Sequence, residues 1–445
     1  MKHKLRASFL NILVLVTLFS SIVVAPAVAS AAETVDVEAE SAILVDAQTG
    51  KILFEKNADL KLPPASMTKM MTEYLVLEAI NNGEISWDTT TQISDYPYSI
   101  SSNPSFSGIG LIQDKDYTVR QLYEAMAIIS DNATTIALAE LVAGSEGEFV
   151  KMMNAKAEEI GLPDYQFVNA TGLSNEDLGD NYPEGTDPSA DNLMSAKSSA
   201  ILAYNLVNDY PEALDISSTM MSELDGRPLE NLNWMLPWDN NNFAQFGFEG
   251  VDGLKTGWTE EAGYCFTGTA ERDGRRVITV VMRTDSKGAR FAETKKLMEY
   301  GFSKFSKEEL FPAGYQIEGE SALPVAKGKE DTVEIAAKDA ITEMIRNGEK
   351  ENYSVNYVLD ESVLNEDGEL VAPIEKGTKV GTMELVYNGE TDYGYIGKDQ
   401  VTQTVDVVTT GAIEKANWFV LAISSIGDFF GNIFSSISNL IKGMF

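Results

Sequence analysis

The strongest structural signal in the chain is the stretch Pro63-Pro-Ala-Ser-Met-Thr-Lys-Met-Met-Thr-Glu-Tyr-Leu-Val-Leu-Glu-Ala-Ile-Asn-Asn82. Large apolar residues recur in it at the spacing of a helix face, and Gly83 follows its last residue, so the stretch predicts a helix that ends there. Ser66 and Lys69 stand three residues apart at the start of this helix, where both side chains point to one side and can form a hydrogen bond. A hydroxyl next to an amine is a candidate nucleophile next to a base. A helix cap followed by a surface lysine is the simpler alternative.

Shorter elements flank this helix on both sides. Two apolar runs, Ala42–Val45 and Lys51–Glu55, predict a β-hairpin with a loose turn. Three further helices are expected, over residues 118–130, 132–142 and 292–305, and the first opens with the capping-box pattern of Thr118 and Gln121. Three further strands are expected, over residues 253–257, 264–271 and 276–283. Strands, then helices, then strands again predict an α+β fold in which helices cover an antiparallel sheet.

Composition and hydrophobic pattern divide the chain into four parts. Residues 1–31 combine a basic start, an apolar run and small residues, which predicts a secretory signal peptide; a retained membrane anchor is the alternative. Residues 35–310 hold the expected α+β domain. Residues 311–410 alternate short apolar runs with Gly, Asn and Asp, which predicts a small β domain.

The fourth part, residues 411–445, lacks the acidic excess of the preceding chain. Apolar residues from Ile423 to Met444 recur every three or four positions opposite Ser, Asn and Gly, so we expect an amphipathic helix that lies in the membrane interface. A helix docked on the β domain is the alternative, and Asp428 argues against a spanning helix. The sequence therefore predicts an exported protein on the outer face of the cytoplasmic membrane, anchored by this helix.

Composition excludes several classes of function. The 445 residues carry a net charge of −34, which argues against nucleic acid as a partner. The single histidine, His3, lies in the predicted signal peptide, and the single cysteine, Cys265, is expected in the core. A mature chain without histidine has no Ser-His-Asp triad, no Cys-His pair and no histidine-ligated metal, and we expect no cofactor. A hydrolase of this composition must activate its nucleophile in another way.

Two further motifs supply candidate site residues. Ser130-Asp-Asn132 lies between two expected helices, where Ser130 and Asn132 can project into a cleft; helix capping is the alternative. Lys255-Thr-Gly257 ends a short apolar run, where Gly257 lets a substrate approach the strand closely; a surface lysine is the alternative. Ser-x-x-Lys, Ser-x-Asn and Lys-Thr-Gly in this order are the signature of active-site serine penicillin-recognising enzymes.

With the supporting stretches at 167–173 and 265–271, these motifs resemble the low-molecular-mass penicillin-binding proteins. These proteins are serine-type D-alanyl-D-alanine carboxypeptidases, and the motifs are most similar to those of the Bacillus-type penicillin-binding protein 5 family. The resemblance covers almost the whole chain. It implies that the chain removes the terminal D-alanine from peptidoglycan stem peptides ending in D-Ala-D-Ala, through an acyl-enzyme that β-lactams also form. One departure is Trp258, where many relatives outside this branch have histidine; the family uses the backbone N–H there, so we expect only a changed pocket mouth.

The resemblance also implies a role for each site residue. Lys69, with a pKa lowered by burial and by Lys255, is expected to take the proton of Ser66, which attacks the penultimate D-alanine carbonyl. Backbone N–H groups of Ser66 and Trp258 are expected to hold the oxyanion, while Ser130 relays a proton to the departing D-alanine. Asn132 is expected to orient Lys69 and the substrate. Lys255 and Thr256 are expected to bind the terminal carboxylate. Gly257 is expected to let the substrate approach the strand closely.

Three rival functions fit parts of the same pattern. A D,D-endopeptidase of the same superfamily cuts cross-links instead of trimming chain ends. A class A β-lactamase shares the three motifs but needs a Glu-x-x-Leu-Asn segment for deacylation, which we expect to be missing. A wall-binding protein without turnover is the third, and the intact motifs argue against it.

Overall fold

The computed structural model describes residues 35–239, 242–397 and 403–417. Its first region contains a five-stranded sheet in the order β2-β1-β11-β10-β9, in which all neighbours are antiparallel. The strands are β1 Ser41–Asp46, β2 Ile52–Lys56, β9 Val251–Thr259, β10 Gly263–Arg272 and β11 Arg275–Thr284. The predicted hairpin and the three predicted later strands are therefore confirmed, each to within a few residues.

A tight turn joins β10 to β11. Arg272 pairs with Arg275, and the two residues between them, Asp273 and Gly274, both have positive φ, at 51° and 73°. An Asp-Gly pair in this conformation matches the right-handed twist of the strands that it connects. The turn therefore fixes the register of the two long strands.

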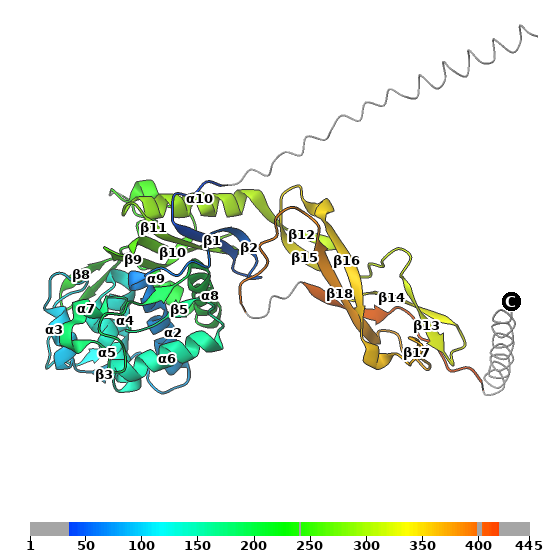
Figure 1. Ribbon diagram of the computed structural model, residues 1–445, viewed down its shortest axis with the longest axis horizontal. Coiled ribbons are helices and arrows are strands. Elements are labelled where there is room, and N and C mark those ends of the chain that lie inside the picture. Colours follow the sequence, from blue (N-terminus) through cyan, green and yellow to red (C-terminus); the bar gives the residue numbers. More distant parts are fainter. Residues whose placement is uncertain (1–34, 240–241, 398–402, 418–445) are drawn as a thin grey trace, which may run out of the picture. The chain divides into compact units, whose positions relative to one another are not determined.

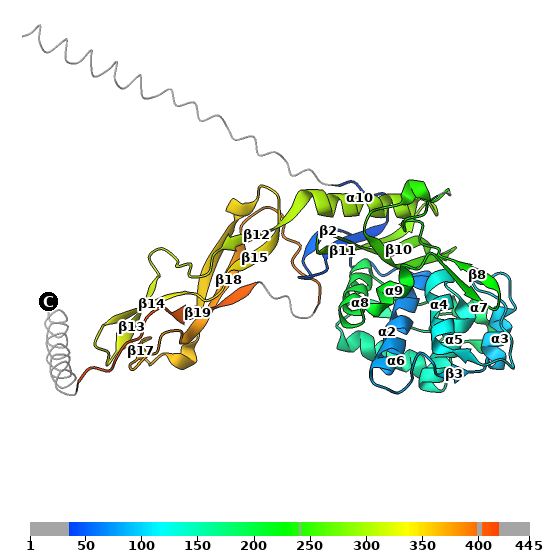
Figure 2. The same cartoon turned by 180° about the vertical axis from the view of Figure 1, so that it is seen from behind.

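Helices cover both faces of this sheet, which Figures 1 and 2 show from opposite sides. Successive residues of β10 point to opposite faces. Phe266 packs edge-on against Phe291 of α10 (Ala289–Lys304), whereas Thr267 forms a hydrogen bond with Ser199 of α8 (Ala196–Asp209). Helix α10 thus lies on one face of the sheet, and the block of helices that contains α8 lies on the other.

The predicted long helix is central to that block. A 3-10 helix, η1 (Ala65–Thr68), leads directly into α2 (Lys69–Asn81), and every residue of α2 from Lys69 to Leu77 is buried. A helix that is buried all round serves as a core element and has no solvent face. Helices α4 (Val119–Ile129) and α5 (Asn132–Ala143) confirm the next two predictions.

Residues 144–237 gave no clear prediction, and the structure resolves them into two 14-residue helices, α6 and α8, and several short elements. The helices of this region and its surroundings are α3 Asp95–Ser101, α6 Glu146–Glu159, α7 Asn175–Leu178, η2 Gly179–Asn181, α9 Glu212–Ser217 and η3 Ala244–Phe246. The paired short strands are β3 Thr90–Thr91 with β4 Tyr117–Thr118, β5 Tyr165–Gln166 with β6 Leu193–Met194, and β7 Met221–Leu224 with β8 Arg227–Glu230. Helix α10 begins three residues before the predicted start at residue 292.

The following residues form two further sheets. Strand β12 (Phe305–Phe311) pairs with β15 (Ile341–Arg346), and a six-stranded sheet has the order β16-β18-β19-β14-β13-β17. The remaining bounds are β13 Ala322–Ala326, β14 Thr332–Ala337, η4 Lys350–Asn352, β16 Tyr353–Leu359, η5 Glu361–Val363, β17 Leu370–Val371, β18 Lys379–Tyr387 and β19 Thr404–Thr409. The expected boundary between residues 310 and 311 falls inside β12.

The two ends of the chain fall outside the described residues, and with them the predicted signal peptide and the apolar stretch Ile423–Met444. Residues 411–417 are described and are not helical, because Ile413 forms a β-bridge with Ile374 and the N–H of Ala416 donates to the carbonyl of Lys327. The helix expected over 411–445 therefore does not include them. Within the described ranges, no helix has the length and apolar character needed to cross a membrane.

Thr118 offers a test of how the helical block is stabilised. Its side chain accepts a hydrogen bond from the backbone N–H of Gln121, and the Gln121 side chain accepts one from the N–H of Thr118, which completes the predicted capping box. We predict that Thr118→Ala lowers the free energy of unfolding by about 1 kcal/mol in urea titrations. Thr118→Ser, which keeps the hydroxyl, should lose less, and equal losses in the two variants would contradict the capping role.

Candidate active site

Ser66 and Lys69 lie where η1 runs into α2. The Nζ atom of Lys69 lies 2.9 Å from Ser66 Oγ, 2.8 Å from Asn132 Oδ1 and 2.7 Å from the carbonyl oxygen of Thr171. A neutral amine has two protons and one lone pair. With the two protons donated to Asn132 and Thr171, the lone pair faces the hydroxyl of Ser66. The arrangement therefore suits an amine that accepts the serine proton.

The surroundings of Lys69 favour that neutral form. Burial lowers the pKa of Lys69 well below its usual value, and the nearby Lys255 ammonium lowers it further. Three buried carboxylates, Asp131, Glu73 and Glu146, act on this pKa in the opposite direction. The net direction is downward, toward the form that can act as a base.

The carbonyl group of Thr171 is held in place by the loop around it. The side chain of Asn169 accepts hydrogen bonds from the N–H groups of Thr171 at 3.1 Å and Gly172 at 2.8 Å. Gly172 has φ +85°, and a Cβ atom there would lie 1.9 Å from the carbonyl oxygen of Ala65. Only glycine lets this loop approach the backbone next to Ser66 so closely. The stretch 167–173, part of the family resemblance, thus holds the carbonyl group that Lys69 contacts.

Ser130 and Asn132 stand at the junction between α4 and α5. Ser130 is the C-cap of α4, with φ 63°, while the side chain of Asp131 caps α5 by accepting the N–H of Thr134 at 3.0 Å. The side chain that caps the start of α5 is therefore that of Asp131 and not that of Ser130. The buried hydroxyl of Ser130 has no hydrogen-bond partner in the described part of the chain. Asn132 accepts from Lys69 and donates to the carbonyl of Ser107 at 3.1 Å.

The third motif lies on β9, the strand at the edge of the sheet. Lys255 is buried, and burial lowers its pKa, against the opposing effect of Glu73 and with a further lowering by Arg290. A Cβ atom on Gly257 would lie 2.4 Å from the carbonyl oxygen of Pro64, so glycine lets β9 pack against the segment that carries Ser66. The Trp258 side chain is 57% exposed and lies beside Tyr264, with ring centroids 6.0 Å apart.

A pocket of about 330 Å³ brings these motifs together. Its walls include five of the predicted site residues, Ser66, Ser130, Thr256, Gly257 and Trp258, and also Ser107, Leu232, Tyr264, Lys287 and Arg290. Lys69, Asn132 and Lys255 are buried and do not line it. The structure thus places one hydroxyl of each serine motif on the same cavity.

Arg290 is a site residue that the sequence analysis missed. It lies near the start of α10, is 3% exposed, and donates to the carbonyl oxygen of Gly257 at 3.1 Å. Burial lowers the pKa of its guanidinium to about 10, which leaves it charged at neutral pH. No motif marks Arg290, and the helix predicted from residue 292 excluded it. An arginine on the apolar face of a helix would have been the available signal.

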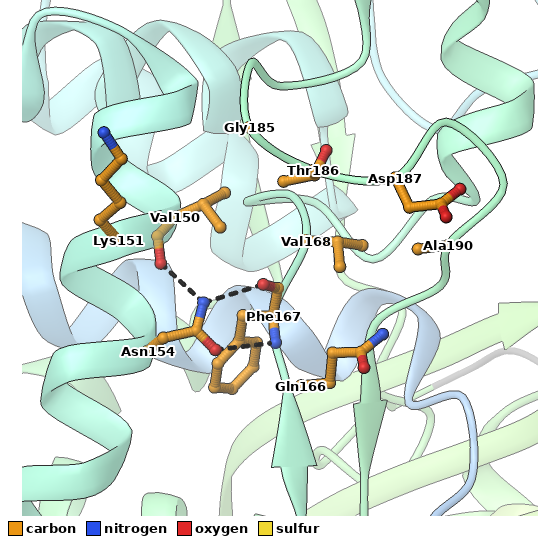
Figure 3. A pocket seen from close by; sticks show the side chains of 10 residues that line it. All are labelled: Val150, Lys151, Asn154, Gln166, Phe167, Val168, Gly185, Thr186, Asp187 and Ala190. Atoms are coloured by element: carbon orange, nitrogen blue, oxygen red, sulfur yellow. Dashed lines mark hydrogen bonds between the residues drawn. The ribbon is translucent and has the colours of Figure 1, made fainter.

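A second, larger hollow of about 560 Å³ shares no residue with this pocket (Figure 3). Asn154 spans its base, donating to the carbonyl groups of Val150 and Phe167, each at 2.8 Å, and accepting the N–H of Phe167. Two of these three contacts join α6 to Phe167, the residue after β5, and the third stays within α6. The serine and lysine motifs lie at the smaller pocket, which we take as the candidate active site.

One expectation about the β-lactamase rival was wrong. The pattern Glu-x-x-Leu-Asn does occur, at Glu361-Ser-Val-Leu-Asn365. It starts at η5, among the strands that follow β12, and none of its residues lines the pocket of Ser66. A deacylating glutamate of that kind therefore does not come from this segment.

Comparison with known families and curated proteins gives two matching models. Residues 27–286 match the family D-alanyl-D-alanine carboxypeptidase, and residues 305–415 match the penicillin-binding protein 5 C-terminal domain. A curated relative, D-alanyl-D-alanine carboxypeptidase DacF of Bacillus subtilis, is 33% identical over 353 residues, which is 79% of this chain and 82% of the relative. The enzyme DacA of Escherichia coli is 31% identical over 358 residues, 80% of this chain and 81% of that protein.

Solved structures give the same result. A peptidoglycan synthesis regulatory factor from Streptococcus pneumoniae is 38% identical, with a TM-score of 0.67 over 85% of this chain and 100% of that one. Penicillin-binding protein D2 of Listeria monocytogenes, solved in a cefotaxime-bound form, is 35% identical, with a TM-score of 0.52 over 61% of this chain and 100% of that one. Since one family model spans more than half of the chain and a curated relative matches most of it, the chain belongs to the D-alanyl-D-alanine carboxypeptidase family of penicillin-binding proteins.

Proposed function

We propose that this chain removes the terminal D-alanine of peptidoglycan stem peptides through an acyl-enzyme on Ser66. The observation that carries the proposal is the hydrogen-bonded group of the half-buried Ser66 with the buried Lys69 and Asn132, beside a pocket that Ser66 lines, in a chain of this family. Lys69 takes the proton of Ser66, and the Oγ atom bonds to the carbonyl carbon of the penultimate residue. The peptide C–N bond then breaks, and D-alanine leaves as the free amino acid.

Ser130 and the backbone support this step. Ser130 lines the pocket, and its buried, unpartnered hydroxyl can pass the proton from Lys69 to the departing amine. We assign the oxyanion to the backbone N–H groups of Ser66 and Trp258, as in the family pattern. Water then hydrolyses the ester, which releases the shortened peptide and restores the hydroxyl of Ser66.

Positive charge explains the preference for a chain end. Two buried cations lie near Gly257: Lys255, two residues before it on β9, and Arg290, which donates to its carbonyl oxygen. Thr256 is part of the pocket wall. A free carboxylate in this pocket is stabilised by these nearby positive charges, whereas an amide is not. β-Lactams present a carboxylate beside a strained amide, and we propose that they acylate Ser66 in the same way. Two structures of the Listeria relative hold such antibiotics, cefotaxime and ampicillin.

An endopeptidase activity is the alternative within the same family. A relative named D-alanyl-D-alanine endopeptidase from Escherichia coli is 26% identical over 273 residues, which is 61% of this chain. The shorter overlap and the match to the C-terminal domain at 305–415 favour the carboxypeptidase. Turnover of a stem pentapeptide and of a cross-linked peptide dimer, measured side by side, separates the two.

We further propose that residues 1–31 direct export and that the tail after residue 417 attaches the enzyme to the outer face of the membrane. The support is the sequence: a basic, then apolar, then small-residue start, and an apolar period of three to four residues at the end. The substrate class is consistent with this location, because peptidoglycan lies outside the cytoplasmic membrane.

Ser66→Ala should abolish both labelling by a fluorescent penicillin and release of D-alanine from a pentapeptide, because the nucleophilic oxygen is gone. Ser105→Ala, which removes an exposed serine hydroxyl elsewhere in the chain, serves as the matched control and should behave as wild type. Labelling of Ser66→Ala at any other residue, read by peptide mass spectrometry, would contradict the assignment.

Lys255→Ala should reduce kcat/KM for peptides with a free terminal carboxylate far more than for the same peptides amidated at that end. The physical reason is the loss of a buried charge that only the carboxylate uses. The amidated peptide is the internal control, and thermal unfolding checks that the variant folds. An equal loss of kcat/KM on both peptides would contradict the proposal that Lys255 binds the terminal carboxylate.

Truncation after Asn417 should release a soluble enzyme from lipid vesicles with unchanged activity on a short peptide. This cut keeps Ile413 and Ala416, which hydrogen-bond to the β-rich region, and removes the apolar tail. Phe430→Asp with Phe434→Asp in the full chain should weaken vesicle binding in the same way. A truncated enzyme that still sediments with vesicles, or loses stability, would show that the tail is a docked structural helix.

A further inference from the structure

Glu73 is a buried acid that the mechanism above does not use. It lies one helical turn after Lys69 on α2, and its side chain is almost completely shielded from solvent, with 2% exposure. Its partner is the hydroxyl of Tyr123 on α4, which donates to Oε2 at a long 3.4 Å. The ring of Tyr123 is fixed edge-on against Trp87. A carboxylate so deep in the helical block costs stability unless a positive charge compensates it.

Two other buried carboxylates surround Lys69, and both are committed to the backbone. Asp131 accepts from the N–H groups of Thr134 and Ile109, at 3.0 and 2.8 Å. Glu146 accepts from the N–H of Ala170 and the hydroxyl of Tyr96, both at 2.9 Å. These two carboxylates therefore hold loops in place. Glu73 accepts no backbone N–H within the described chain, so its charge has another purpose.

Lys255 is the cation that this charge serves best. Its Nζ atom is buried and makes one long hydrogen bond of 3.4 Å, to the carbonyl oxygen of Thr256. Strand β9, which carries Lys255, packs against α2. The electrostatic effect of Lys255 on Glu73 exceeds that of Lys69, and Glu73 is the carboxylate that supports the charge of Lys255. The pKa of Lys69 is raised by three carboxylates, Asp131, Glu73 and Glu146, and Asp131 has the largest effect of the three.

We propose that Glu73 is a positioning residue that keeps the ammonium charge on Lys255, so that Lys69 is the lysine left neutral as the base. The site holds two buried lysines, and the mechanism requires one of them to be charged and the other neutral. The buried carboxylate of Glu73 favours the protonated, charged form of Lys255. The inference rests on the proposed roles of Lys69 and Lys255. Glu73 acts through these two lysines and does not contact the substrate.

The charged and titratable groups that act electrostatically on this cluster come from several elements. They are Lys69 on α2, Tyr123 on α4, Asp131 at the start of α5, Glu146 on α6, Glu212 on α9, Lys255 on β9 and Arg290 on α10. Burial raises the pKa of Glu73, against the lowering effects of Lys255, Tyr123 and Lys69. Above that raised pKa the carboxylate is ionised and raises the pKa of Lys255. Removing the carboxylate therefore lowers the pKa of Lys255, and the lysine loses its proton at a lower pH.

The test is the pH dependence of kcat/KM for a free-carboxylate peptide in Glu73→Gln. The alkaline limb should move to lower pH, and a shift of one unit gives about a tenfold loss at pH values above the limb. The acidic limb, set by Lys69, should move in the same direction by less. The loss should appear in KM, and the amidated peptide should show no shift of the alkaline limb.

Two variants make the result specific. Glu73→Asp keeps a carboxylate and should restore most of the alkaline limb. Glu78→Gln makes the same chemical change on the same helix, at a glutamate paired with Lys156 at 2.7 Å, and should leave the profile unchanged. Thermal unfolding shows that each variant is folded.

A folded Glu73→Gln with the wild-type profile, or with an equal loss at every pH, overturns the inference. If Lys255→Ala still distinguishes free from amidated ends, only the role of Glu73 has failed. If Lys255→Ala does not distinguish them, the proposed carboxylate site has failed and the inference falls with it.

Discussion

The active site depends on one buried amine. Lys69 is removed from water at the start of the central helix, and its three hydrogen-bond contacts reach a serine hydroxyl, a side-chain amide and a backbone carbonyl from three separate segments. Burial makes the neutral form favourable, and the two acceptors orient its lone pair toward Ser66. A chain whose only histidine is His3 thus obtains a general base from desolvation of a lysine.

Much of the surrounding fold serves to bring these segments close. Glycine at positions 172 and 257 lets a loop and a sheet edge approach the backbone of residues 64 and 65, where any side chain would collide with a carbonyl oxygen. Helix α2 is buried over most of its length, so the amine and the Glu73 carboxylate share one low-dielectric region with Lys255. Charges in such a region interact strongly. Small changes in one of them alter the protonation of the others, which is why a residue away from the substrate can affect the pH range of activity.

The sequence predicted the parts of the fold that local patterns encode. The hairpin, the capping box at Thr118 and the helix after Pro64 all depend on neighbouring residues, and the structure confirms them. The elements between Gly144 and Pro237 were not predicted, because contacts within the folded domain stabilise them and buried asparagines such as Asn169 and Asn231 look like loop residues in sequence. The motif residues were identified as candidates, but Thr171, Arg290 and Glu73 were not. Thr171 meets Lys69 from 102 residues away, a contact that no local spacing reveals.

The central claim is that Lys69 acts as the neutral base for Ser66. The most direct measurement is the rate of Ser66 acylation by a penicillin in Lys69→Arg at neutral pH, followed by mass spectrometry. Arginine keeps the positive charge but does not lose its proton in this range. The account predicts a folded variant that acylates slower by about 100-fold or more, the usual contribution of a general base. A folded Lys69→Arg variant that acylates at the wild-type rate would contradict it.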